Sequence, residues 1–134
     1  MKSLAAALEA QAPKATVPVQ VEADGVGRYP QEIEAAVYFC CLEALQNVQK
    51  YATATHVSVR IAQRDGALSF EVQDDGKGFD TGRTKPGSGL TNMTDRLDAL
   101  GGTVDVSSTP GRGTTITGVL AVKELVVASA AGFG

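Results

Sequence analysis

The chain has 134 residues, of which 43% are hydrophobic, and a formal net charge of −3 at pH 7. This length is enough for one domain with a substantial core and too short for two domains of ordinary size. The negative charge gives no general attraction to nucleic acid or to an anionic membrane, and no apolar run is long enough to span a bilayer. Nothing at the N-terminus resembles a signal peptide, so we expect a cytoplasmic protein.

The first part of the chain predicts a short helix, a strand and a long amphipathic helix. We expect the short helix over residues 4–11, as the stub of a connecting segment, and the strand over 17–22. The long helix is expected over 33–51, because apolar residues recur there at three- and four-residue spacing. Neighbouring helical side chains point about 100 degrees apart, so Cys40 and Cys41 are not expected to form a mutual disulfide.

One face of the long helix carries an acid, an amide and a cation. Glu43, Asn47 and Lys50 are spaced at i, i+4 and i+7, so their side chains project from the same side. On any single helix such a row is as readily a solvated face as a binding site. The glycine loops that follow along the chain favour the binding site.

The middle of the chain predicts a hairpin whose second strand ends in a glycine loop. Alternating apolar residues indicate strands over 56–63 and 68–74, and Asp65-Gly66 is typical of the turn between them. The loop is Asp74-Asp75-Gly76-Lys77-Gly78-Phe79. Its glycines leave room for a ligand to approach the main chain, with the first carboxylate beside it. Alone, this string is as readily a simple turn.

A second glycine cluster opens the next helix. Gly87-Ser88-Gly89-Leu90 precedes a helical pattern over 90–99, and unpaired N–H groups at a helix start suit an anion such as phosphate. We expect the polar segment 79–88 to be a mobile lid, with Arg83 and Lys85 in solvent. Arg96 is expected to hold the helix to the sheet by an ion pair.

The last part of the chain predicts a second hairpin. Strands are expected over 103–107 and 114–122, joined by a glycine turn, with the Thr114 hydroxyl at the start of the final strand and a poorly fixed tail over 123–134. The elements together predict a single domain with its core at about 15–122. Its fold class is an α/β two-layer sandwich, with a mixed, mostly antiparallel sheet and helices on one face.

The order of these motifs resembles the GHKL, or Bergerat-fold, ATP-binding domain shared by sensor histidine kinases, DNA gyrase and mismatch-repair ATPases. Glu43-x-x-x-Asn47 resembles the N box of that family, Asp74-x-Gly76-x-Gly78 the G1 box, Gly87-x-Gly89-Leu90 the G2 box, and Gly113-Thr114 the closing Gly-Thr. The run over residues 89–96 and the Leu-Gly-Gly at 100–102 look most like the NarL/DesK-type kinases. The sequence departs from that subfamily at Tyr51, where a histidine usually stands.

The resemblance implies ATP and Mg²⁺ as ligands. A carboxylate only accepts hydrogen bonds, so Asp74 would bind the N6 amine of adenine and disfavour the carbonyl of guanine. Thr114 would lie near the base, through an ordered water, while Gly76 and Gly78 would give the close backbone approach. Asn47 would be the direct Mg²⁺ ligand, and Glu43 would orient or deprotonate a water or nucleophile. Lys50 and the N–H groups of Gly87, Gly89 and Leu90 would face phosphate.

As a function, the resemblance implies the catalytic domain of a two-component sensor histidine kinase. Such a domain transfers the γ-phosphate of ATP to a histidine on a separate dimerisation domain, which then serves a response regulator. His56, the one histidine, precedes a strand and is expected to be a surface residue, not the acceptor. The domain would be cytoplasmic, alone or as part of a membrane-bound sensor. An anti-sigma-factor serine kinase and a non-catalytic ATP-switched binding module remain alternatives.

Overall fold

The computed structural model describes residues 3–48, 54–78 and 88–122. Each helix and strand that the sequence predicts in these ranges is present, with ends that differ by a few residues. In chain order the elements are α1 (Leu4–Gln11), the short 3-10 helix η1 (Ala12–Lys14), β1 (Val19–Asp24), α2 (Gln31–Asn47), β2 (Val57–Arg64), β3 (Ala67–Asp74), α3 (Ser88–Asp98), β4 (Thr103–Thr109) and β5 (Gly113–Ala121).

The strands form one mixed sheet in the order β1-β2-β3-β5-β4. Only β1 and β2 run parallel among the paired strands, and the other three pairs are antiparallel. The β2–β3 hairpin turns at Asp65 and Gly66, whose φ angles of 52° and 76° are those of the tight turn that suits twisted strands. The predicted Asp-Gly hairpin is therefore confirmed.

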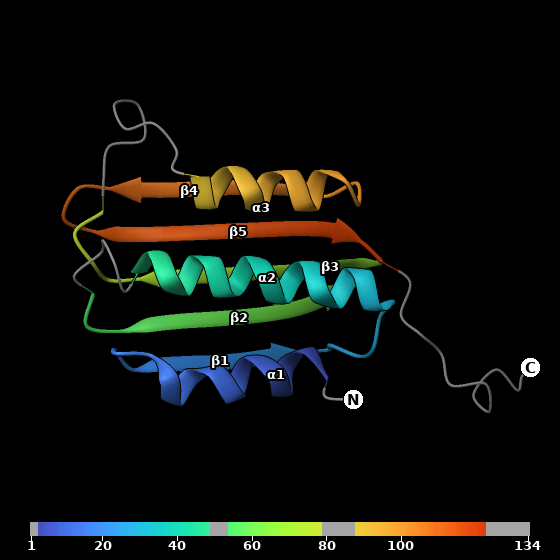
Figure 1. The fold of residues 1–134 in the computed structure, drawn as a ribbon, viewed down its shortest axis with the longest axis horizontal. Coiled ribbons are helices and arrows are strands. Elements are labelled where there is room, and N and C mark those ends of the chain that lie inside the picture. The colour runs from blue at the N-terminus through green and yellow to red at the C-terminus, as the bar shows by residue number, and fades with distance from the viewer. Residues whose placement is uncertain (1–2, 49–53, 79–87, 123–134) are drawn as a thin grey trace, which may run out of the picture.

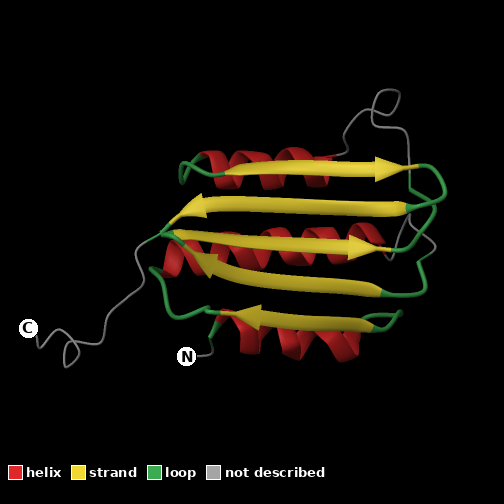
Figure 2. Ribbon diagram, turned by 180° about the vertical axis from the view of Figure 1, so that it is seen from behind, coloured by secondary structure: helices red, strands yellow, loops and turns green. Residues whose placement is uncertain are grey.

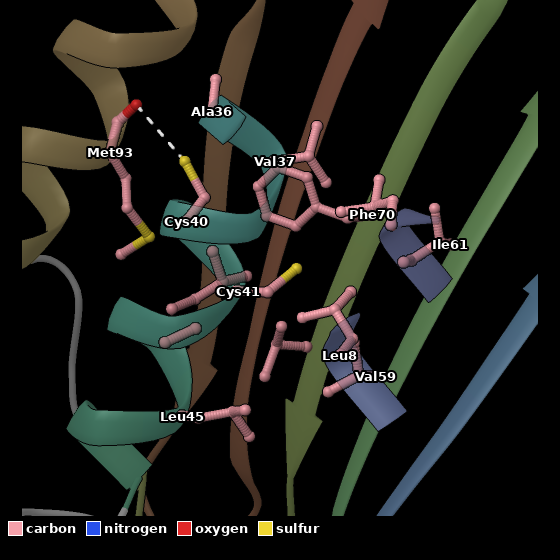
Figure 3. Packing of buried hydrophobic residues seen from close by; sticks show 14 of the residues in the cluster. Leu8, Ala36, Val37, Cys40, Cys41, Leu45, Val59, Ile61, Phe70 and Met93 are labelled. Carbon is pink, nitrogen blue, oxygen red and sulfur yellow. Dashed lines mark hydrogen bonds between the residues drawn. The ribbon is translucent and has the colours of Figure 1, made fainter. Parts of the chain in front are cut away.

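All three α-helices cover the same face of the sheet, which confirms the predicted two-layer sandwich (Figures 1 and 2). The strands bury alternate residues, as in β3, where Leu68, Phe70 and Val72 point to the helices. Their partners in the core come mainly from α2, including Val37 and Cys41 (Figure 3). None of the described helices covers the opposite face of the sheet, which is called the uncovered face below (Figure 2).

Helix α1 packs on the core, and the expected domain boundary at about residue 15 stays a prediction. Leu4 and Leu8 are 2% and 1% exposed and pack with the buried cluster of α2 and the sheet. A helix with so short an apolar stripe gives no sequence signal of what it packs against. Whether α1 also continues a connecting segment stays a prediction.

The two cysteines of α2 are buried, free thiols, as predicted. The Cys40 thiol lies 3.9 Å from the carbonyl oxygen of Met93 in α3 (Figure 3). Burial raises the pKa of Cys40 to about 11 and raises the pKa of Cys41 still more. Both residues therefore act as small core side chains and not as nucleophiles.

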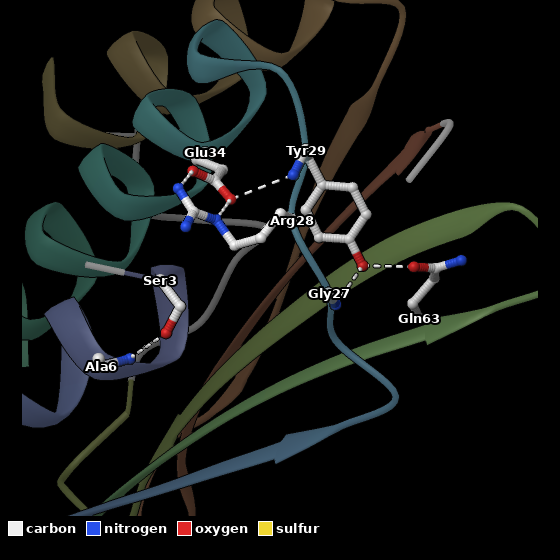
Figure 4. Close-up of polar contacts among 7 residues, drawn as sticks. All are labelled: Ser3, Ala6, Gly27, Arg28, Tyr29, Glu34 and Gln63. Atoms are coloured by element: carbon white, nitrogen blue, oxygen red, sulfur yellow. Dashed lines mark hydrogen bonds and ion pairs between the residues drawn. The ribbon is translucent and has the colours of Figure 1, made fainter. Parts of the chain in front are cut away.

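Polar contacts fix the start of α2 (Figure 4). Glu34 accepts hydrogen bonds from Arg28 Nε at 2.9 Å and from the backbone N–H of Tyr29 at 3.1 Å. The buried Tyr29 hydroxyl donates to Gln63 of β2 and accepts the N–H of Gly27. These bonds tie the loop before α2 to the sheet and so set the position of the helix that carries Glu43 and Asn47.

Among the described helices, none has the length and apolar character needed to cross a membrane.

Candidate functional site

One end of the sheet brings four side chains into a single row across the strands. Val57, Asp74, Thr114 and Ser108 are successive partners in the registers of β2, β3, β5 and β4. Because side chains alternate along a strand, Asp74 projects to the same face as buried Val72, toward the helices. The predicted site residues Asp74 and Thr114 are thus direct neighbours on the helix-covered face.

The Asp74 carboxylate is buried and held by backbone donors. The residue is 7% exposed, and its Oδ1 accepts the N–H of Gly76 at 2.8 Å. Burial raises the pKa of Asp74, although hydrogen bonds from the backbone of Gly76 and Thr114 oppose this effect. A carboxylate kept partly desolvated in this way is a candidate for ligand recognition.

The glycine loop after Asp74 packs against the β4–β5 hairpin. Gly78 has a φ of 61°, and a Cβ atom there would overlap the carbonyl oxygen of Thr109. Gly113 has a φ of 87°, and a Cβ there would overlap the carbonyl oxygen of Asp74. The tight approach at Gly78 is therefore between two segments of this chain, and ligand approach at Gly78 stays a prediction. Ligand approach at Gly76 stays a prediction.

Glu43 and Asn47 lie one turn apart near the end of α2, and both are half-buried. Their spacing puts them on one helix face, as predicted. An amide oxygen and a nearby carboxylate suit Mg²⁺ only if water and phosphate complete its six ligands. The described residues hold no cluster of three or more His, Cys, Asp or Glu side chains that could bind a metal alone. Lys50 lies outside the described residues.

Helix α3 begins at Ser88, so its first turn contains Gly89 and Leu90 of the expected anion site. Gly87 and the lid with Arg83 and Lys85 lie outside the described residues. Buried Met93 and Leu97 anchor α3 on the core. Helix α3 also packs against α2. This packing determines the relative positions of the two helices at the end of the sheet.

Among the described residues, Arg96 of α3 makes no ion pair to the sheet, contrary to our expectation. Its guanidinium lies 4.0 Å from the ring centroid of Phe39 in α2. Such a cation–π contact joins the two helices that flank the row of Asp74 and Thr114. No local pattern in the sequence indicates this pair, because it depends on how α2 and α3 pack.

Asp75 connects the start of β2 to the glycine loop, a role that the sequence motifs do not indicate. Its carboxylate accepts the backbone N–H groups of Thr55 at 2.8 Å and His56 at 3.0 Å, and also the Thr55 hydroxyl. Hydrogen bonds hold the pKa of Asp75 well below its usual range, and the bond from the Thr55 side chain has the largest effect. His56 itself is a surface residue with a 76% exposed side chain, as predicted.

The uncovered face of the sheet has a hollow, but its chemistry is that of a solvated surface. Its lining includes Glu22, Asp24, Arg60 and Arg64, which form the exposed pairs Arg60–Glu22 and Arg64–Asp24. Exposed ion pairs are mostly screened by water and contribute little. The hollow lies on the opposite face from Asp74, so we do not place the site there.

Comparisons with known proteins show that the chain is similar to sensor histidine kinases. The signal transduction histidine-protein kinase/phosphatase DegS of Brevibacillus brevis is 40% identical over 90 residues, which is 66% of this chain and 23% of that protein. The corresponding UhpB of Salmonella typhimurium is 42% identical over 71 residues, covering 53% of this chain and 14% of that protein. The chain thus spans less than a quarter of the length of these relatives.

Solved structures show the same fold. The histidine kinase domain of the Erythrobacter litoralis EL346 blue-light activated kinase superposes with a TM-score of 0.74 at 20% identity, covering 90% of this chain and 61% of that one. The mycobacterial sensor histidine kinase MprB superposes with a TM-score of 0.66 at 22% identity, covering 91% and 93%.

The family match covers the N-box helix, both glycine loops and the final strands. It runs over residues 32–124, well over half of the chain, and the protein therefore belongs to the family of histidine kinase-, DNA gyrase B-, and HSP90-like ATPases.

Proposed function

We propose that this chain is the ATP-binding catalytic domain of a two-component sensor histidine kinase of the NarL/DesK type. It would transfer the γ-phosphate of ATP to a histidine on a separate dimerisation domain, for signal transduction to a response regulator. The observation that carries the proposal is the buried Asp74 acceptor, held beside Thr114 where β3 ends and β5 begins, between α2 and α3. The kinase names of its relatives support the same class.

The base would be selected by hydrogen-bond polarity. Asp74 offers only lone pairs, so it would accept the N6 amine of adenine and oppose the O6 carbonyl of guanine. Its fixed backbone bond from Gly76 keeps one carboxylate oxygen oriented. Because the carboxylate is mostly removed from water, the bond to an amine would be stronger than at an exposed site.

The phosphates would lie between the C-terminal end of α2 and the N-terminal end of α3. Asn47 would hold Mg²⁺ through its amide oxygen, with water and phosphate oxygens as the remaining ligands. Glu43, one turn earlier, would orient or deprotonate the attacking group. The N–H groups at Gly87, Gly89 and Leu90, together with Lys50, would compensate phosphate charge.

The phosphoacceptor would come from another domain. His56, the one histidine of the chain, precedes β2, and its backbone N–H and that of Thr55 are bonded to the carboxylate of Asp75. This contact fixes the main chain around His56 close to the strand ends. We propose that the acceptor histidine approaches the γ-phosphate from a partner domain.

The test is phosphotransfer from γ-labelled ATP to a separately supplied histidine-containing dimerisation domain. We expect acid-labile phosphohistidine on that domain, reduced transfer with Asp74→Asn at limiting ATP, and unchanged transfer with His56→Ala. Acid-stable phosphoserine on a partner would favour the serine kinase alternative. ATP binding without transfer to any supplied domain would favour a binding module and count against the kinase proposal.

A further inference from the structure

We infer that Arg96 is a positioning residue, which acts through Phe39 to set the separation of the two helix ends that would share the Mg²⁺-bound phosphates of ATP. This inference rests on the proposed function, since it concerns the same nucleotide site. Arg96 is in the last turn of α3, and its guanidinium lies 4.0 Å from the ring centroid of Phe39 in α2. The contact therefore joins the two helices that would hold the metal and the phosphates.

The contact of Arg96 with Phe39 is separate from the apolar packing that holds α3 on the core. Met93 and Leu97 of α3 are buried, whereas Arg96 is exposed and Phe39 is half-buried. A guanidinium is attracted to an aromatic ring when it lies over the face of that ring. Loss of the Arg96 charge should therefore leave the apolar packing of α3 in place and remove only this link to α2.

The side of α2 that contacts α3 also carries Glu43. Phe39 and Glu43 are four residues apart and so lie on one face of the helix. Between them, the thiol of Cys40 lies 3.9 Å from the carbonyl oxygen of Met93 in α3. The charges give the same arrangement, because burial raises the pKa of Cys40, the Arg96 cation lowers it, and the Glu43 carboxylate raises it. The Arg96 contact is thus one helical turn from the proposed catalytic carboxylate.

The two helices run in opposite directions, so the C-terminal end of α2 and the N-terminal end of α3 lie at the same end of the sheet (Figure 1). Asn47 is eight residues after Phe39, and Ser88, where α3 begins, is eight residues before Arg96. Each helix end is therefore about 12 Å along its axis from the cation–π contact. The contact sets where Asn47 lies relative to the first turn of α3.

Magnesium binding would be the property most sensitive to this separation. Mg²⁺ requires nearly ideal octahedral geometry, with ligands at about 2.0–2.1 Å. Asn47 of α2 would supply one ligand, and the phosphates held at the first turn of α3 would supply others. A small shift between the two helix ends would therefore weaken the metal contacts. The adenine would be held by Asp74 and Thr114 of the sheet, so its binding would not depend on the separation of the helices.

The experiment is calorimetric titration of the whole chain with ATP in Mg²⁺ and in EDTA. The magnesium gain is the ratio of the Kd in EDTA to the Kd in Mg²⁺. Arg96→Gln should reduce this gain about two- to fivefold, the effect of one exposed cation–π contact, and leave the Kd in EDTA nearly unchanged. Arg96→Lys keeps a cation and should keep most of the gain. Arg60→Gln is the matched control, because it removes the same charge from the uncovered face, where Arg60 pairs with Glu22.

A double-mutant cycle tests whether Arg96 acts through Phe39. Phe39→Leu removes the ring but keeps an apolar side chain, so it should lower the magnesium gain as Arg96→Gln does, and the two changes together should lower it no further. An unchanged gain in Arg96→Gln, equal losses in Mg²⁺ and EDTA, or a loss that Phe39→Leu does not share would overturn the inference while the ATP site stands. Failure of the unmutated chain to bind ATP would instead overturn the proposed function, and the inference with it.

Discussion

Gly78 and Thr109 are in such close backbone contact that only a residue without a side chain fits at position 78. A Cβ atom there would overlap the Thr109 carbonyl oxygen, and the backbone of Gly78 also has a φ of 61°, which other residues rarely adopt. This contact holds the glycine loop after Asp74 against the β4–β5 hairpin. The loop and the hairpin therefore have to keep their positions together.

Gly78→Ala should reduce the free energy of unfolding by about 1–3 kcal/mol, because strain and the overlap act together. Denaturant unfolding measures this change. The matched control is Gly111→Ala in the same hairpin, where φ is 81° but no atom lies within 4 Å of an added Cβ. Equal losses in the two variants would mean that the contact with Thr109 contributes nothing beyond backbone strain.

Asp74→Asn should weaken ATP binding without weakening the fold. Loss of the charged acceptor should cost about 1.5–3 kcal/mol, or roughly tenfold to a hundredfold in Kd. Burial raises the pKa of Asp74, so its stabilising contribution is present at low pH and is lost as pH rises through the folded-state pKa. Near pH 7 the ionised carboxylate therefore opposes folding, and the variant should unfold no more easily than the original chain.

Calorimetry and denaturant unfolding at pH 7 together test this prediction. Glu71→Gln is the control, because Glu71 is in the same strand but on the uncovered face. It should change neither quantity appreciably. A large loss of stability in Asp74→Asn would show that Asp74 is a structural residue. It would contradict the argument that the buried, ionised carboxylate opposes folding and serves ligand recognition.

Asp75 should make stability depend on pH in the opposite direction. Its pKa is held below the usual range, so the stabilisation is present above the unfolded-state pKa of about 4 and is lost as pH falls through the folded-state pKa. Asp75→Asn should therefore be less stable than the original chain at pH 7, and the difference should shrink in acid. Unfolding curves at several pH values give the comparison, with exposed Asp105→Asn as control. A difference that does not vary with pH would exclude the ionised Asp75 as its cause.

Variants at Asn47 and Glu43 should have different effects, the first on Mg²⁺-dependent ATP binding and the second on phosphotransfer. Asn47→Ala should weaken ATP binding in Mg²⁺ and matter much less in EDTA, because the amide oxygen is proposed as the direct ligand. Glu43→Ala should reduce phosphotransfer more than binding. Titrations with and without Mg²⁺ check the first effect, and exposed Gln46→Ala is the control on the same helix. Identical losses in both conditions would contradict the role given to Asn47.

The sequence predicted the elements well because their signals are local. The alternation of Leu68, Phe70 and Val72 marks one buried strand face, and Asp65-Gly66 marks the turn before it. The family resemblance implied that Asp74 and Thr114 lie near the same base, and their direct pairing comes from the register of β3 and β5. Motifs place residues at a site, but they do not give the contacts among them.

The contacts that the sequence did not predict depend on register and packing. Ser108 stands beside Thr114 only because β4 and β5 pair with that register, and the same hydroxyl one residue earlier would face the other side. Arg96 meets Phe39 through the packing of α3 on α2. Leu4 and Leu8 show the same limit, since two apolar residues in a short helix do not identify the surface that covers them.

The strand order has a consequence for how the chain is synthesised. The last strand of the described residues, β5, lies between β3 and β4, and β4 pairs with no other strand in these residues. While a ribosome is still making residues 113–121, the emerging chain can pair β1, β2 and β3, but β4 has no neighbour in the sheet. Insertion of β5 then adds both missing pairings and also brings Thr114 and Ser108 beside Asp74. A partly made chain therefore cannot hold nucleotide in this row, and cellular ATP would stabilise only chains whose sheet is complete.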